Sequence, residues 1–569
     1  MNCIIVDDEP LAREAMKLLI EESDNLQLIG SFNSAATASD FMEQQGVDLV
    51  FLDIQMPGIT GIEFARTISK KTLVIFTTAY TEYALDSYEV DAIDYLIKPV
   101  EAERFQKAVD KALSYHSLLL KEEKEAIEQR QEAIRELSSE LEFRQQFRLL
   151  GLLYKGKPSD TSAIKEWVNS PSDYRKHAFL RILPTAVGII NLLCIGATIL
   201  GFLPASISGI VFACFVVFSF IFSKGITKIQ ATYGEKLQIL STYADQILIT
   251  EKKEMHSPAL QQLKAELTSQ NQTASQSVHR LAKLMNALDQ RGNLLMSTIL
   301  NGLLFWELRQ VMQIEKWKEA HSADLPRWIE AIGAIDAYCS LATFSYNHPD
   351  YIYPQITSQS FHLQAEALGH PLMDRNKCVR NGIDMEKRPF FIIITGANMA
   401  GKSTYLRTVG VNYLLACIGA PVWAAKMEIF PARLVTSLRT SDSLTDNESY
   451  FFAELKRLKL IIDKLKAGEE LFIILDEILK GTNSMDKQKG SFALIKQFMS
   501  MDANGIIATH DLLLGTLIDA FPQNIRNYCF EADITNNELT FSYQMRSGVA
   551  QNMNACFLMK KMGIAVIDG

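Results

Sequence analysis

One stretch of this chain, between residues 390 and 415, constrains its fold more than any other. The short apolar run Phe390–Ile394 precedes the loop Thr395–Thr404 (TGANMAGKST), and a helical pattern follows from Tyr405 to Leu415. An apolar run of this length is typical of a buried parallel strand. The stretch therefore predicts an α/β domain in which the loop joins a central strand to a helix.

The loop has the composition of a phosphate-binding loop. Gly396 and Gly401 allow the backbone to turn its N–H groups toward phosphate oxygens. Lys402 adds a positive charge for the β- and γ-phosphates, and Ser403 offers a hydroxyl to Mg²⁺. Because the N-terminus of the following helix also favours an anion, we expect ATP and Mg²⁺ to bind here.

Two later apolar runs end in residues suited to nucleotide hydrolysis. The run 471–475 ends at Asp476 and Glu477, and the run 506–509 ends at His510. We expect Asp476 to hold Mg²⁺, Glu477 to polarise the attacking water, and His510 to sense the γ-phosphate. Each residue alone is weak evidence, since an Asp-Glu pair is usually at the surface and a lone histidine is usually structural. Their order downstream of the glycine-rich loop favours an ATPase.

Four apolar runs near the N-terminus each lead into polar residues. They span residues 3–6, 49–52, 73–76 and 92–97, with helical stretches between them, which is typical of a parallel sheet. In such sheets the site lies at the carboxyl ends of the strands, where Asp7, Asp8, Asp53, Thr78 and Lys98 follow. Carboxylates that converge need a cation between them, so we expect Mg²⁺ at this edge as well.

Residues 1–116 resemble the receiver domain of two-component response regulators. The resemblance implies a flavodoxin-like (βα)5 fold, phosphorylation of Asp53 by a sensor histidine kinase, and Mg²⁺ held by Asp7, Asp8, Asp53 and the backbone of Gln55. It also implies that Thr78 and Tyr95 form a switch pair and that Lys98 contacts the phosphoryl group. The alternative is a receiver-like fold that no longer takes phosphate. The closest resemblance is to receivers that precede LytTR-type DNA-binding domains, but no such domain follows here.

Residues 182–223 contain no Asp, Glu, Lys or Arg. The stretch suits two membrane helices, about 182–203 and 206–223, since each span needs about 20 apolar residues. Basic residues flank both ends, so the positive-inside rule places the receiver and the ATPase in the cytoplasm, with the hairpin in the inner membrane. The alternatives are a buried hairpin in a soluble core and a hairpin that dips only partway into the bilayer.

The segments around this hairpin have helical patterns. Ile127, Ile134 and Leu141 recur at heptad spacing, which fits either a short coiled coil or a solvated linker. Residues 231–350 are amphipathic and indicate a helical bundle or lever. The expected domains are therefore a receiver (1–116), a helical linker or coiled coil (117–170), a transmembrane hairpin (171–230), a helical lever region (231–350) and an ATPase domain (351–569).

The C-terminal part, about 231–569 and most clearly after 390, resembles the MutS family of DNA mismatch-repair ATPases. The loop matches that family's phosphate loop, which adds Asn398, Met399 and Thr404 to the expected nucleotide contacts. The segments 476–484 and 508–510 match as well, with Leu479 and Lys480 departing. The segment 448–454 is similar to the family's Ser-Thr-Phe signature, with Tyr450 in place of Thr. The resemblance implies a homodimer in which Ser449 reaches the γ-phosphate bound by the partner, and the tail 547–554 is similar to a dimer-contact segment.

Other features of the sequence argue against mismatch recognition. There is no Gly-x-Phe-x-Glu motif, and the receiver and hairpin occupy the place of the family's N-terminal DNA domains. The densest basic run fits a solvated helix face better than a DNA-backbone contact: Lys456, Arg457, Lys459, Lys464 and Lys466. The net charge of −9 gives no overall attraction to DNA either.

These observations favour a membrane-anchored, dimeric MutS-like ATPase that is regulated by phosphorylation of Asp53. DNA binding is implied by the family resemblance alone. Two alternatives stay open: a DNA-binding clamp of mismatch-repair type, and a fused gene product whose receiver and ATPase act independently. The eight cysteines are scattered without CxxC pairs, which indicates neither a disulfide framework nor a zinc site.

Overall fold

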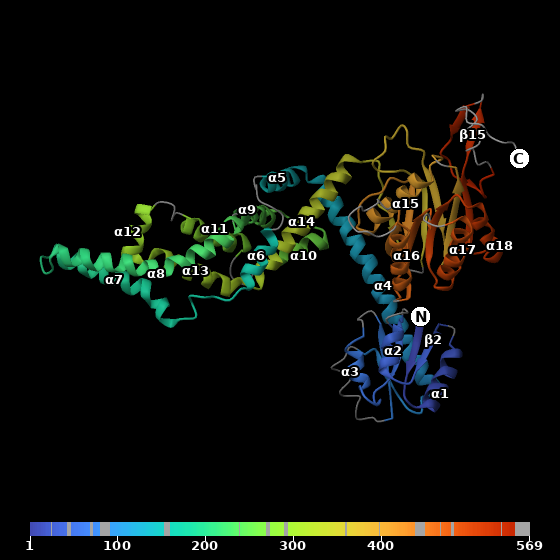
Figure 1. Ribbon diagram of the computed structural model, residues 1–569, viewed down its shortest axis with the longest axis horizontal. Helices are drawn as coiled ribbons and strands as arrows, with labels where there is room; N and C mark the ends of the chain where they lie inside the picture. Colours follow the sequence, from blue (N-terminus) through green and yellow to red (C-terminus); the bar gives the residue numbers. More distant parts are fainter. Residues whose placement is uncertain are drawn as a thin grey trace. The chain divides into compact units, whose positions relative to one another are not determined.

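The computed structural model describes the chain in two compact units, residues 1–131 with 350–569 and residues 132–349 (Figure 1). The description leaves out residues 24, 43–46, 69–71, 80–91, 153–159, 238, 269–272, 290–293, 359–360, 398, 439–449, 467, 480–482, 536–537 and 552–569.

The N-terminal domain is the expected parallel sheet, in the strand order β2-β1-β3-β4-β5. Its strands are β1 (Asn2–Val6), β2 (Gln27–Phe32), β3 (Leu49–Asp53), β4 (Leu73–Thr78) and β5 (Asp94–Ile97), with the helices α1 (Pro10–Glu21), α2 (Ala35–Met42) and α3 (Gly61–Ala65). Alternate residues of the central strands enter two apolar cores, one on each face of the sheet. The edge strand β2 was not predicted, because none of its residues is fully buried and its sequence has no continuous apolar run.

A single helix, α4 (Ala102–Ser139), belongs to both the receiver and the linker. Phe105 and Val109, near its beginning, pack in the receiver core, whereas Ile127 packs in the core of the C-terminal domain. Ile127 and Ile134 are both buried within this chain, and the third heptad position, Leu141, lies on the next helix, α5 (Leu141–Leu152). The heptad spacing therefore reflects packing inside the chain and not a coiled coil.

The C-terminal domain contains a six-stranded sheet in the order β11-β12-β13-β9-β14-β17, parallel except for β17. The strands are β9 (Phe390–Gly396), β11 (Arg433–Ser437), β12 (Leu471–Asp476), β13 (Asn504–Thr509), β14 (Ile525–Phe530) and β17 (Arg546–Ser547). A second sheet, in the order β6-β10-β7-β8, is formed by β6 (Gln355–Ile356), β7 (Leu363–Leu368), β8 (Asn381–Met385) and β10 (Lys426–Ile429). A short hairpin, β15 (Ala532–Thr535) and β16 (Glu538–Phe541), completes the strands.

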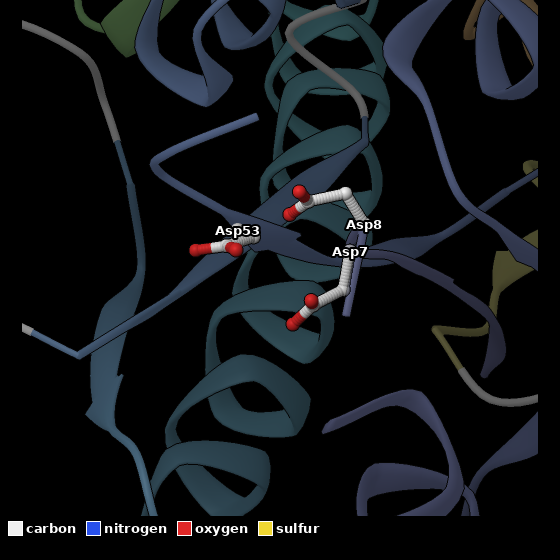
Figure 2. A group of neighbouring side chains, drawn as sticks. All are labelled: Asp7, Asp8 and Asp53. Carbon is white, nitrogen blue, oxygen red and sulfur yellow. The ribbon is translucent and has the colours of Figure 1, made fainter. Parts of the chain in front are cut away.

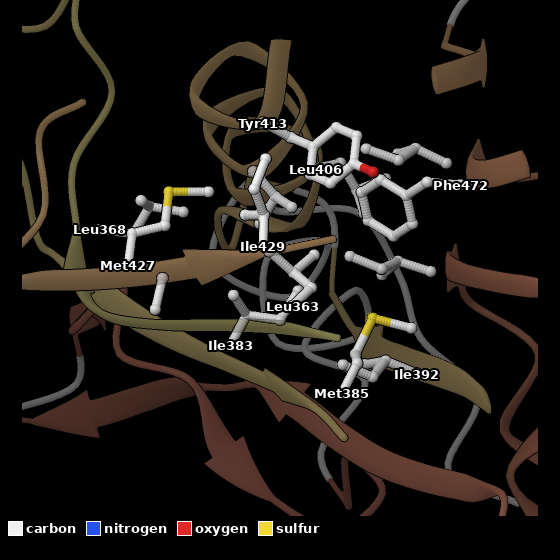
Figure 3. Packing of buried hydrophobic residues seen from close by; sticks show 14 of the residues in the cluster. Leu363, Leu368, Ile383, Met385, Ile392, Leu406, Tyr413, Met427, Ile429 and Phe472 are labelled. Carbon is white, nitrogen blue, oxygen red and sulfur yellow. The ribbon is translucent and has the colours of Figure 1, made fainter. Parts of the chain in front are cut away.

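The helix α15 (Lys402–Cys417) lies in the core between these two sheets. Figure 3 shows its Leu406 and Tyr413 among residues of both sheets, such as Ile429 and Phe472. The opposite face of the six-stranded sheet packs against α16 (Tyr450–Lys466) and α17 (Ser484–Ser500). Covered on both faces, β9 is the buried central strand that its apolar run predicted, and it holds the glycine-rich loop at its carboxyl end.

Residues 132–349 form a helical unit. Its remaining helices are α6 (Asp160–Asn169), α7 (Ala178–Ile199), α8 (Ala205–Leu237), α9 (Ile239–Lys252), α10 (Pro258–Glu266), α11 (Ala274–Asp289), α12 (Leu294–Leu304), α13 (Trp306–His321) and α14 (Asp324–Asn347). Two segments are long and apolar enough to cross a membrane, Ala178–Ile199 and Ala205–Ser223. Only 22% of the first segment's most apolar window is buried, and none of the second's.

Candidate functional site

The glycine-rich loop between β9 and α15 has a backbone that only glycine fits. Gly396 has φ +146°, and a Cβ there would collide with the carbonyl oxygen of Phe530 on the neighbouring strand β14. Gly401, with φ +110°, caps the N-terminus of α15. These two positions turn the chain tightly from the strand into the helix, which leaves the first N–H groups of α15 directed at the loop.

The side chain of Lys402 is buried under this loop. Its Nζ donates hydrogen bonds to the carbonyl oxygens of Gly396 (2.8 Å) and Ala397 (2.9 Å). Ser403 and Thr404 follow in the first turn of α15. The ammonium group therefore lies where the backbone of the loop turns, which is the position from which it could meet a phosphate.

Asp476 and Glu477 end the strand β12, which lies two strands from β9 in the sheet. Asp476 is buried, and its Oδ1 has no hydrogen-bond partner within the described part of the chain. A buried carboxylate oxygen without a partner is costly, and together with the hydroxyl of Ser403 it is the kind of ligand that Mg²⁺ prefers. These residues therefore fit the expected cation.

Glu477 has a strained backbone and a defined partner. Its φ is +51°, its N–H donates to the carbonyl oxygen of Ala508 (2.8 Å), and its Oε1 lies 2.7 Å from Nε2 of His510. Positive φ is uncommon for residues other than glycine and occurs often at functional sites. The sheet thus brings together a glutamate and a histidine that are far apart in the sequence.

Glu454 was not predicted as a site residue, but it holds the segment that follows β12 and contains Glu477. It lies buried on α16, and its Oε1 accepts a hydrogen bond of 2.7 Å from the N–H of Leu479, which has φ +58°. In the sequence, Glu454 shares one helical face with Leu458, Ile461 and Leu465, all buried. An acid on an otherwise apolar face was the feature that could have identified it.

A cavity of about 590 Å³ opens beside the loop. The loop residues from Gly401 to Thr404 line it together with Glu477, and Phe530 and Tyr543 lie on its wall. Cavities of roughly 300–1,000 Å³ suit small-molecule ligands. The ring of Tyr543, stacked on Phe541 with centroids 5.9 Å apart, is a lining group that sequence reasoning missed, because nothing in the sequence links residue 543 to the loop.

In the receiver, three acidic side chains converge as expected (Figure 2). One carboxylate oxygen each of Asp7, Asp8 and Asp53 lies within 4.8 Å of the others. The Nζ of Lys98 lies 2.7 Å from Oδ2 of Asp7 and 3.0 Å from Oδ2 of Asp53, while the N–H of Gln55 donates to Asp53 (3.4 Å). This set of oxygens fits a divalent cation beside the proposed phosphoacceptor.

The electrostatics of the receiver cluster are those of an incompletely neutralised acidic site. Burial raises the pKa of Asp53, and the charge of Asp7 adds to this, although the hydrogen bond from Lys98 lowers it. Burial lowers the pKa of Lys98, but its hydrogen bonds and charge interactions with Asp7 and Asp53 outweigh burial and leave it raised. One ammonium thus bridges two carboxylates, and a cation would complete the neutralisation.

The two proposed switch residues differ in exposure. Thr78 is buried at the end of β4, while Tyr95 on β5 is partly exposed, with the guanidinium carbon of Arg104 5.8 Å from its ring centroid. Several other expected site residues, Asn398, Ser449 and the segment 552–554, lie outside the described residues.

The basic run of α16 faces away from the core. Lys456, Arg457 and Lys459 are exposed, whereas Leu458, Ile461 and Leu465 of the same helix are buried in the sheet's second core. Lys464 pairs with Glu469 at 2.8 Å. A solvated helix face and a DNA contact would both require this exposure.

Comparisons with known proteins identify two domains. Residues 3–110 match the response regulator receiver domain, and residues 392–565 match MutS domain V. The DNA mismatch repair protein MutS of Thermotoga neapolitana is 31% identical over 234 residues, which are 40% of this chain and 28% of that protein. An uncharacterized response regulatory protein of Vibrio cholerae is 42% identical over 118 residues, 20% of this chain and 50% of that protein. The transcriptional regulatory protein BtsR of Salmonella typhimurium is 38% identical over 111 residues, 19% of this chain and 46% of that protein.

The chain thus spans about half of these response regulators and little more than a quarter of the MutS relative. The two matched segments do not overlap, and each coincides with an α/β domain described above. The chain therefore carries a response regulator receiver domain at its N-terminal end and a MutS domain V in its C-terminal part, joined in one polypeptide.

Proposed function

We propose that the chain is a Mg²⁺-dependent ATPase of MutS type whose activity is controlled by phosphorylation of its receiver domain. One observation carries the proposal: the glycine-rich loop and its buried Lys402 lie beside a cavity that Glu477 also lines. Binding groups for phosphate and a candidate base for water thus share one space.

The residues divide the reaction between them. The loop N–H groups and Lys402 bind the β- and γ-phosphates, and the ammonium exchanges its bonds to the Gly396 and Ala397 carbonyls for phosphate oxygens. Asp476 and Ser403 would hold Mg²⁺, which when bound would neutralise charge on the phosphates. Glu477 accepts a proton from the attacking water, and His510 keeps its carboxylate oriented.

Control by the receiver is supported by the helix α4. Asp53 accepts a phosphoryl group from the phosphohistidine of a kinase, which adds about −1.5 to −2 charge to the acidic cluster. Further along α4, Gln131 donates to the carbonyl oxygen of Pro354 (2.9 Å) and Arg130 to that of Cys417 (3.5 Å). Cys417 is the last residue of α15, the helix that starts at the glycine-rich loop. One helix thus contacts both the receiver core and the far end of the loop's own helix.

The proposal also covers assembly and location. A homodimer with composite sites follows from the resemblance around Ser449. Anchoring of the α7–α8 hairpin in the inner membrane, with both domains in the cytoplasm, is supported by the exposed apolar side chains of residues 182–223, a stretch without Asp, Glu, Lys or Arg.

Steady-state ATP hydrolysis by the purified full-length chain tests the proposal. We expect turnover that needs Mg²⁺ and disappears in Lys402→Ala, because the loop then lacks its cation. Turnover that survives both chelation and Lys402→Ala would assign the hydrolysis to another protein in the preparation and contradict the proposal.

A further inference from the structure

We infer that the α7–α8 hairpin enters one leaflet of the bilayer without crossing to the other side, and that α12 lies beside it at the membrane surface. The inference rests on the proposed membrane anchoring. It specifies how deep the hairpin inserts and adds α12 as a third helix that contacts the membrane. Sequence alone favoured two full spans. The helices α12 and α13, which pack against the hairpin, favour a shorter insertion.

The far end of the hairpin is built for an apolar environment. Its exposed side chains are large and apolar, among them Ile189, Leu192, Leu193, Ile199, Leu200, Phe202, Ile207 and Ile210. Two of its hydroxyl groups bond inside the hairpin: Oγ1 of Thr198 and Oγ of Ser208 lie 2.7 Å apart, and both lie within hydrogen-bond distance of the carbonyl oxygen of Cys194 (2.9 and 3.2 Å). Internal satisfaction of polar groups is what a water-free surrounding requires.

The near end of the hairpin packs against a helix with exposed charged side chains. The helix α13 packs its Leu308 and Met312 against Val187 of α7 in a small apolar cluster, with Phe215 of α8 at its edge. On the outside of α13, Arg309 and Lys316 are exposed. A charged side chain inside hydrocarbon costs several kcal/mol, so the level of Val187 and Phe215 lies outside the hydrocarbon core.

The remaining length is too short to cross. Between that level and the turn, each helix has about 12 residues, which at 1.5 Å per residue extend about 18 Å. The hydrocarbon core is about 30 Å thick. The hairpin therefore ends inside the bilayer, and the exposed Phe179, Ile182, Phe220 and Ile221 near its base lie at the headgroup level, where aromatic residues are favoured.

The helix α12 is fixed to the hairpin at this same boundary. The buried Asn191 of α7 donates to the carbonyl oxygens of Gly302 (3.0 Å) and Leu303 (3.1 Å), the last turn of α12. A Cβ on Gly302 would collide with the ring of Phe212 and lie 2.6 Å from a methyl of Val216, so this contact requires glycine. Phe305, with φ +48°, then redirects the chain from α12 into α13.

The outer face of α12 is apolar and exposed. Leu295, Met296 and Ile299 are 77%, 51% and 48% exposed, and the helix contains no charged residue. Figure 1 shows α12 running across α7 and α8 and not along them. A short apolar helix that crosses the hairpin where it enters the lipid is placed to lie in the interface, where it limits how deep the hairpin inserts.

Depth measurement by spin labelling tests this. The full-length chain is reconstituted in phosphatidylethanolamine and phosphatidylglycerol vesicles, in a background where Cys194, Cys214, Cys378, Cys417 and Cys556 are alanine. Nitroxides are placed at Phe202→Cys in the turn, Ile299→Cys on α12 and, as an aqueous control, Leu152→Cys, which is exposed on α5. Collision with oxygen and with a water-soluble nickel chelate reports the depth of each.

We expect near-complete loss of nickel collision at residue 202, partial loss at residue 299 and none at residue 152. Nickel collision at residue 202 as frequent as at residue 152 would mean that the turn emerges on the far side, and would overturn the inference while leaving the anchor intact. Asn191→Ala should loosen only α12, so that the label at residue 299 changes and the label at residue 202 does not. A chain that fails to float with the vesicles would overturn the membrane proposal itself.

Discussion

At the scale of single residues, the proposed nucleotide site contains strained positions that neighbouring residues hold in place. Glu477 and Leu479 both have positive φ, and each has a hydrogen bond that fixes it, from Glu477 to Ala508 and from Leu479 to Glu454. Such strain persists only where surrounding contacts enforce it. The pairing of Glu477 with His510 is then the most direct structural basis for a role in proton transfer.

We predict that Glu477→Gln binds ATP but hydrolyses it about 100-fold more slowly or worse, because the amide cannot accept the proton from water. Single-turnover hydrolysis and equilibrium binding of labelled ATP separate the two effects. Glu386→Gln, an exposed glutamate in the same domain, serves as the control. Rapid turnover in Glu477→Gln would remove this residue from its proposed role.

A second prediction concerns Glu315 in the helical unit. Its buried carboxylate accepts hydrogen bonds from the backbone N–H groups of Asp173, Tyr174 and Arg175, which fixes the chain just before α7. Glu315→Ala leaves these donors unsatisfied, and we expect a loss of about 1–3 kcal/mol in the free energy of unfolding.

Denaturant unfolding of the full-length chain, followed by helical circular dichroism, measures this loss. Glu319→Ala removes a more exposed acid one turn along the same helix, whose partner is Arg175. We expect it to change stability by less than about 1 kcal/mol. Equal effects of the two substitutions would show that the hydrogen bonds from this backbone segment to Glu315 contribute no more to stability than the exposed ion pair of Glu319.

At the scale of elements, the sequence predicted those whose pattern is local. The apolar runs of β1, β3, β4, β9, β12 and β13, the glycine-rich loop and the helical pattern after it all correspond to observed elements. The edge strand β2 could not be predicted, because its residues are only partly buried and its sequence mixes apolar and polar residues. The contact of Glu477 with His510 and the approach of Tyr543 to the loop could not be predicted from spacing, since long-range packing creates them.

The sequence also did not predict that α4 is one continuous helix from the receiver into the linker. Its heptad-spaced isoleucines are equally typical of a coiled coil, and only the structure shows that this chain buries them. The docking site is tight: a Cβ on Gly419, which has φ +84°, would lie 2.8 Å from Cβ of Arg130. This close approach links α4 to the turn that follows α15.

We therefore predict that Gly419→Ala loosens α4 from the C-terminal domain and uncouples ATP hydrolysis from receiver phosphorylation. The ATPase rate is measured with and without acetyl phosphate as phosphodonor. Gly201→Ala serves as the control, since Gly201 also has positive φ (+78°) but an added Cβ would have nothing within 4 Å; it shares the backbone strain of about 1–3 kcal/mol without the clash. An unchanged phosphorylation response in Gly419→Ala would exclude α4 docking as the route.

At the scale of the whole molecule, a receiver domain, a MutS domain V with a proposed ATP site and an apolar hairpin are combined in one chain. The MutS relatives are named for DNA mismatch repair, but this sequence has no Gly-x-Phe-x-Glu motif and its net charge is −9. We predict that duplex DNA, matched or mismatched, leaves the ATPase rate unchanged. Stimulation that fades steeply as salt rises would instead reveal phosphate contacts and favour the DNA-clamp alternative.

The most direct test of the account is the steady-state Mg²⁺-ATPase rate of the full-length chain in vesicles, before and after addition of acetyl phosphate, beside Asp53→Asn and Lys402→Ala. The account predicts hydrolysis that Lys402→Ala abolishes, and a change of rate on phosphorylation that Asp53→Asn lacks. Equal responses of the wild type and Asp53→Asn would mean that receiver and ATPase act independently. A wild-type rate no higher than that of Lys402→Ala would contradict the central claim that this site hydrolyses ATP.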